Sequence, residues 1–284
     1  MGGPVDLERD RVTLLEAPAP ADPAVAAPAA AEPAPLAPAA GLLPAMAAVY
    51  RAQLARARVA RIPLLFVATF QSIGILVMMR GVVDPGDSPA ARSVVAGSSV
   101  LVVAFVALNL LAQYFGRLRA TGGLDHYATL PVPPAAVVLG AAGAYASFTL
   151  PGSLVTAGFG AWLFGLSAAH LWVLLAVVPL AGAALAGLGA ACGLLAPKQE
   201  IATLLGQLGM SAALLLGVLP VDHLPTFVQW LRDLLPSTYG VEAFARTFGE
   251  RPDWTAVAGD LSVCAGVALA SLTLAAWAYR RATR

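Results

Sequence analysis

Six apolar runs, each long enough or nearly long enough to cross a lipid bilayer, constrain this chain more than any other feature. They cover residues 62–79, 94–114, 135–162, 171–196, 201–219 and 257–279. A helix rises 1.5 Å per residue, so about 20 apolar residues cross roughly 30 Å of hydrocarbon. The sequence therefore predicts an all-α, polytopic membrane protein with six transmembrane helices.

The composition agrees with a membrane location. Hydrophobic residues make up 59% of the chain and charged residues only 12%, whereas soluble domains carry roughly 25% charged residues. The net charge is +1, so no strong field attracts nucleic acid, and we expect membrane lipids rather than nucleic acid as surroundings.

The N-terminal part divides into two segments before the six-span domain of residues 62–284. Residues 1–41 are rich in Pro and Ala, with little to bury, which predicts a disordered tail. Residues 42–61 place Leu43, Met46, Tyr50 and Leu54 along one helical side and arginines on the other. This pattern is typical of an amphipathic helix in the headgroup layer.

The arginines predict the orientation of the chain. Four of them flank the first span: Arg51, Arg56, Arg58 and Arg61. Since basic residues concentrate on the cytoplasmic side, both termini are predicted to lie in the cytoplasm of a cell whose inner, or plasma, membrane holds the chain.

Two connections between spans stand out. Residues 122–134, GGLDHYATLPVPP, begin with two glycines, continue with a short helical pattern and end in three prolines, which stop a helix. We interpret this segment as a cytoplasmic stub that a partner protein contacts; an ordinary interfacial turn is the alternative. Residues 220–253 instead predict two short amphipathic helices on the external side, just before the last span.

Uncharged polar residues within the spans have two interpretations. Gln71, Asn109, Gln113 and Gln207 are candidates for lining a substrate path, or they bond neighbouring helices. Gly189 and Gly193 have the GxxxG spacing of a close helix contact, either within one subunit or between two.

The sequence predicts no catalytic, cofactor-binding or metal-binding residue. It has no GxxxxGK[ST] loop for nucleotide phosphates, and its only lysine, Lys198, lies in APKQE. His126, His170 and His223 are scattered, without the clustering of a metal site. The spans carry essentially no charge, which argues against transport driven by ions.

Four features together resemble the membrane subunit of ABC exporters of the type-2 permease superfamily, which includes daunorubicin-resistance-like drug permeases. They are the six-span plan with its amphipathic N-terminal helix, residues 122–140 (GGLDHYATLPVPPAAVVLG), residues 194–208 (LLAPKQEIATLLGQL) and residues 220–247, with LPSTY and the following Glu242-Ala243.

The resemblance implies specific partners. Such subunits pair with an identical or homologous permease and bind two copies of a cytoplasmic ABC ATPase, which holds the ATP and Mg²⁺. The 122–134 segment then contains a coupling helix. Its residues at the ATPase would be Leu124, Asp125, His126 and Tyr127.

We therefore expect a permease subunit, not an enzyme, that exports a hydrophobic or amphipathic compound such as a drug. Two alternatives stay open: export of a lipid-linked or polysaccharide substrate, and a non-transporting membrane anchor or sensor.

Overall fold

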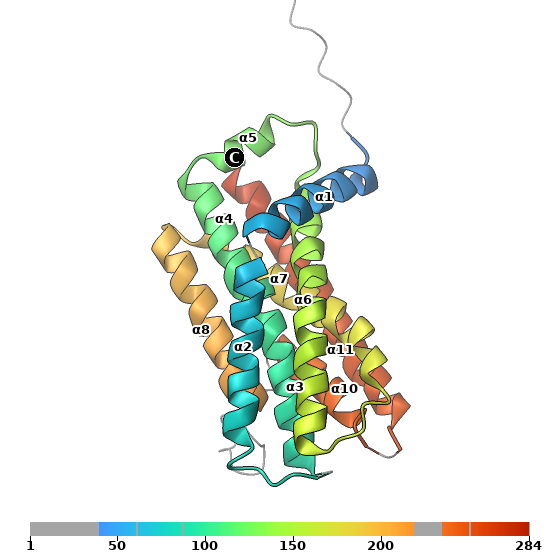
Figure 1. The fold of residues 1–284 in the computed structure, drawn as a ribbon. Coiled ribbons are helices and arrows are strands. Elements are labelled where there is room, and N and C mark those ends of the chain that lie inside the picture. The colour runs from blue at the N-terminus through green and yellow to red at the C-terminus, as the bar shows by residue number, and fades with distance from the viewer. Residues whose placement is uncertain (1–39, 61, 87, 219–234, 250, 284) are drawn as a thin grey trace, which may run out of the picture. The chain divides into compact units, whose positions relative to one another are not determined.

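The computed structural model describes residues 40–60, 62–86, 88–218, 235–249 and 251–283, and over this part of the chain its regular structure is helical, with no strand (Figure 1). The elements are α1 (Leu42–Ala60), α2 (Ile62–Met79), α3 (Pro89–Val103), η1 (Ala104–Leu110), α4 (Leu111–Ala120), α5 (Gly123–Ala128), α6 (Pro134–Phe164), η2 (Leu171–Val173), α7 (Leu174–Leu195), α8 (Gln199–Val218), α10 (Pro236–Arg246) and α11 (Trp254–Ala282). Six helices are long and apolar enough to cross a membrane, which confirms the all-α fold with six spans.

Several spans extend beyond the apolar runs because polar residues cap them. The Ser88 hydroxyl accepts a hydrogen bond from the Ala91 amide at 3.1 Å, and Pro89 occupies the first helical turn, so α3 begins five residues before Val94. At the last span, Asp253 Oδ1 accepts from the amides of Thr255 and Ala256 at 3.0 and 3.1 Å. Hydropathy alone does not detect such polar first turns.

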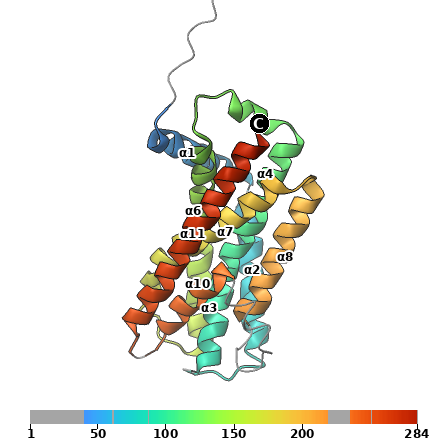
Figure 2. The same cartoon turned by 180° about the vertical axis from the view of Figure 1, so that it is seen from behind.

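The second span, which runs through α3, η1 and α4, is the buried centre of the bundle. In its most apolar stretch 89% of the residues are buried, against 17% in α2 and 22% in α8. Its middle, η1, is a π-helix, a wider coil that is uncommon and often accompanies function. Helices α6, α7, α8 and α10 pack around this span (Figures 1 and 2).

Small residues allow α7 to approach the second span closely. A Cβ atom added at Gly189 would collide with the Leu108 carbonyl oxygen, and one added at Gly193 would collide with that of Ala112. The GxxxG spacing therefore serves a contact within one chain. Helix α1 approaches α6 in a similar way, since a Cβ at Gly140 would lie 2.8 Å from the Met46 carbonyl oxygen.

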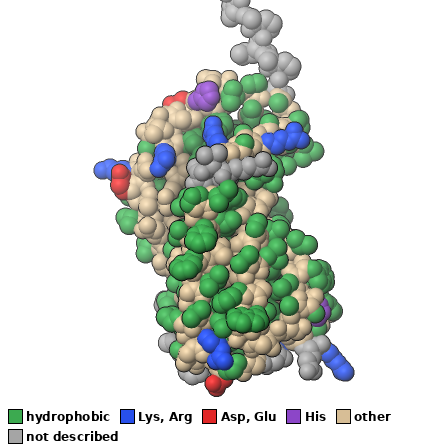
Figure 3. All heavy atoms as spheres, in the orientation of Figure 1, with side chains coloured by type: hydrophobic (Ala, Val, Ile, Leu, Met, Phe, Trp, Pro, Cys, Tyr) green, Lys and Arg blue, Asp and Glu red, His purple; other side chains and the backbone are tan. Residues whose placement is uncertain are grey.

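The two ends of the bundle differ in composition from its middle. Charged side chains gather at both ends, and an apolar band separates them on the face in Figure 3. Helices α1 and α5 and the C-terminal end of α11 lie at one end, which we call the α5 end (Figure 1).

The opposite end contains α10, the second of the two short helices predicted before the last span. Its Val241 and Phe244 are buried, and so is Phe248, which follows the helix. Helix α10 packs against α3, α7 and α11, so it is inserted into the bundle. The first short helix is predicted within residues that lie mostly outside those described.

We expect Gly189→Ala to destabilise the chain, because the added methyl group has no space between α7 and η1. Overpacking of this kind costs about 1–3 kcal/mol. Thermal unfolding in detergent measures the loss. Gly266→Ala is the matched control, since a Cβ there meets nothing within 4 Å; equal stability of the two variants would contradict the close contact.

Candidate functional site

Glycine and proline define the limits of helix α5. Gly122 has φ 71°, a left-handed conformation that turns the chain out of α4 and that other residues rarely adopt. Pro133 and Pro134 begin α6, so the segment between them forms only the six-residue helix α5. The amide of Ala40 donates to the carbonyl of Pro131 at 2.9 Å, which ties the start of α1 to the exit from α5.

The four predicted coupling residues divide between two faces of α5. Leu124 is 3% exposed and belongs to the hydrophobic core, and Tyr127 is half-buried against that core. Asp125 and His126 are exposed. Leu124 and Tyr127 thus hold α5 on its own bundle, while Asp125 and His126 are the pair that faces outward. Their contact with an ATPase stays a prediction.

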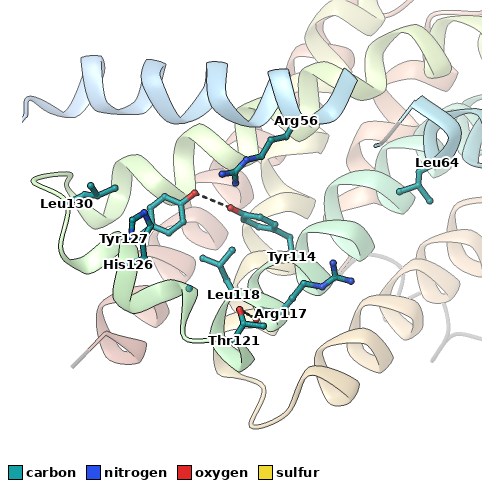
Figure 4. A pocket seen from close by; sticks show the side chains of 10 residues that line it. Arg56, Leu64, Tyr114, Arg117, Leu118, Thr121, His126, Tyr127 and Leu130 are labelled. Carbon is teal, nitrogen blue, oxygen red and sulfur yellow. Dashed lines mark hydrogen bonds between the residues drawn. The ribbon is translucent and has the colours of Figure 1, made fainter. Parts of the chain in front are cut away.

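A polar connection links α1, α4 and α5. The amide Nε2 of Gln53 donates to the Tyr114 hydroxyl at 2.5 Å, and the hydroxyls of Tyr114 and Tyr127 lie 3.4 Å apart (Figure 4). Gln53 is 1% exposed, so its hydrogen bonding is made away from water and matters for stability. The sequence analysis did not single out Gln53; its signal is an uncharged amide within an otherwise apolar and basic helix.

A pocket of about 940 Å³ lies beside this connection. Four elements line it: Arg56 from α1, Leu64 from α2, Tyr114, Arg117 and Leu118 from α4, and Gly123, His126 and Tyr127 from α5, together with Thr121 and Leu130 (Figure 4). Its polar groups are mostly hydrogen-bond donors, and no carboxylate is among the lining residues.

Arg119 joins the end of α4 to the end of α7. Its Nη1 donates to the carbonyl oxygens of Leu194 at 2.6 Å and Ala196 at 3.0 Å. A guanidinium at a helix C-terminus satisfies carbonyls that lack helical partners and complements the helix dipole. The sequence analysis did not single out Arg119, because the partner carbonyls are 75 or more residues away.

The four residues predicted for a substrate path do not all meet. Asn109 and Gln113 are joined, since Gln113 Nε2 donates to Asn109 Oδ1 at 3.0 Å, and Asn109 is buried against Gly206 of α8. Gln71 and Gln207 instead occupy exposed positions on α2 and α8. Their role in a path remains a prediction.

One charged residue falls within residues 257–279, the sixth apolar run, which the sequence analysis treated as essentially uncharged. Asp260 of α11 accepts from Arg246 Nε of α10 at 2.9 Å. Asp260 lies in the second turn of α11, near the end opposite α5, so the pair ties α10 to α11. Among the residues that the structure describes, no group of three or more His, Cys, Asp or Glu side chains is placed to hold a metal ion.

Comparison with known proteins covers most of this architecture. A model of the ABC-2 type transporter family matches residues 46–248, from within α1 to just beyond α10. A search of curated proteins finds no match to the chain.

We expect Arg119→Gln to lower stability by about 1 kcal/mol, because two charge-assisted hydrogen bonds to the α7 end are lost from a partly exposed site. Thermal unfolding in detergent measures the change. Arg280→Gln removes an exposed arginine at the same end of the bundle and is the control. A matching loss in both variants would show that charge, and not the α4–α7 bond, is responsible.

Proposed function

Because this chain belongs to the ABC-2 type transporter family, we propose that it exports a hydrophobic or amphipathic compound, such as a drug or natural product. The chain is a multi-pass membrane permease, and its family implies pairing with ABC ATPase subunits. In this proposal two ATPase copies bind the ATP and Mg²⁺, and the permease supplies the pathway.

The observation that carries the proposal is the division of α5 into two faces. Leu124 and Tyr127 anchor the helix on the bundle, and Asp125 and His126 remain exposed for a partner. A short helix that is packed on one side and exposed on the other is suited to transmit a displacement of the ATPase to the bundle. An ATPase docking here gains hydrogen bonds to both exposed side chains.

This displacement would be transmitted through apolar packing and hydrogen bonds. From α5 it reaches α4 through Leu124 in the core and through the Tyr127–Tyr114 pair, and it reaches α1 through Gln53. The second span then displaces its neighbours, because packed helices move as rigid bodies. Arg119 extends this connection to the α7–α8 turn.

The basic residues support a cytoplasmic position for the α5 end. It contains Arg51, Arg56, Arg117, Arg119, Lys198, Arg280 and Arg281, whereas Arg80, Arg92, Arg246 and Arg251 belong to the other end. The excess of basic residues at the α5 end follows the positive-inside rule. We therefore propose a plasma membrane location with both termini in the cytoplasm.

The exposed faces of α2 and α8 support pairing with a second permease, identical or homologous. Phe66 and Phe70 of α2 stack with ring centroids 6.1 Å apart and are exposed, as are Leu204 and Leu208 of α8. Gln71 and Gln207 are exposed on the same two helices. A primary amide in hydrocarbon is costly, so these glutamines favour a partner or a hydrated path over lipid.

We expect the double variant Asp125→Ala/His126→Ala to reduce copurification with its ATPase, since it removes the outward polar groups of α5. Export of a fluorescent amphipathic dye, assayed in vesicles with ATP, should fall about tenfold or more, given that each lost bond to a charged group is worth roughly 1.5–3 kcal/mol. Asp84→Ala, an exposed carboxylate at the other end, is the control. Normal copurification and export by the double variant would refute docking at α5.

We expect a cysteine at position 126 to be protected from a membrane-impermeant maleimide in intact cells and labelled after lysis. A cysteine at position 84 should react in intact cells. Both are made in a background with Cys192→Ala and Cys264→Ala, the two native thiols. Labelling of position 126 in intact cells would reverse the orientation.

A further inference from the structure

The lining of the pocket beneath α1 includes both basic side chains and leucines. Arg56 extends from α1, and its guanidinium points toward the hydroxyls of Tyr114 and Tyr127 (Figure 4). Arg117 adds a second guanidinium to the lining. Arginine binds phosphate and carboxylate oxygens in bidentate fashion, and a phenol adds a hydrogen-bond donor. Such a set of groups is suited to an anion.

A smaller cavity adjoins the pocket and adds polar side chains and another leucine to the lining. A second, smaller cavity of about 150 Å³ shares Leu64, Tyr114 and Arg117 with the pocket and extends to Leu110 and Gln113. Gln113 is the residue bonded to Asn109 in the middle of the second span. The two cavities therefore adjoin, and we call the pair, which extends from the basic end of the bundle toward Gln113, the track.

We propose that this track receives an anionic amphiphile, whose phosphate or carboxylate headgroup binds Arg56 and Arg117. The apolar part then lies along Leu64 and Leu110. The inference rests on the proposed export function and deepens it, because it assigns the substrate class a negative charge and a lateral entry at the α5 end.

The location of the pocket favours an amphiphile over a soluble anion. Its walls come from α1, which lies across the end of the bundle, and from α2, which is a span with an exposed apolar face. An amphiphile in the adjoining leaflet already has its headgroup at the level of α1 and its chain beside α2. A soluble phosphate would gain nothing from the leucines.

The test uses the purified full-length chain in detergent and two fluorescent probes with the same acyl chains, phosphatidic acid and phosphatidylcholine. We expect the phosphatidic acid probe to bind at least about fivefold more tightly than the phosphatidylcholine probe. Arg56→Gln and Arg117→Gln should each weaken binding of the phosphatidic acid probe about fivefold, because one basic residue near an anionic lipid contributes about that much. Arg56→Lys should retain most of the affinity because it keeps the charge.

Arg51→Gln is the matched control, since Arg51 is exposed on the same helix but is not among the residues that line the pocket. Equal binding of both probes, or an equal loss in Arg51→Gln and Arg56→Gln, would overturn the proposal. Displacement of the probe by millimolar inorganic phosphate would assign the site to a soluble anion and would also overturn it. Size-exclusion chromatography verifies that each variant is folded.

The binding assay contains no ATPase and no nucleotide, so its outcome is separate from that of the export assay. Selective binding of phosphatidic acid without ATP-driven export would refute the proposed function and leave the anion site standing. Export without selective binding would refute only the anion site.

Discussion

Backbone-to-backbone packing around the second span is the interaction on which the rest of this bundle depends. In a bilayer, apolar side chains gain little by leaving lipid for protein, so helices associate through close contact and hydrogen bonds. Gly189 and Gly193 bring α7 against the carbonyls of the second span. This span is buried at the centre, in contact with α6, α7, α8 and α10. The connection from α5 to α4 therefore reaches the centre of the bundle and not only its periphery.

The sequence predicted the features that follow from hydropathy and backbone chemistry. Six apolar runs became six helices, and the glycines and prolines of residues 122–134 became a short helix. It did not predict the helix ends at Ser88 and Asp253, because caps are polar and lie outside an apolar run. The π-helical turn at η1 has no distinctive pattern in the sequence.

The sequence identified the segment that contains the site, but not which of its side chains form the exposed surface. The sequence placed Leu124, Asp125, His126 and Tyr127 together on one short helix, but it could not tell which of them the bundle would cover. Gln53, Tyr114 and Arg119 escaped notice because their partners lie far away in the sequence. Long-range hydrogen bonds depend on how helices are arranged, and a single sequence carries no direct record of that arrangement.

The glycine surface of α7 has a consequence for motion. Helices usually interlock through ridges of side chains, and to slide one along another means lifting each ridge out of its groove. Where glycine faces carbonyl, there are no ridges to lift. At these two positions interlocking side chains do not set the axial register of α7 against the second span, and the two hydrogen bonds of Arg119 to the end of α7 are what oppose sliding.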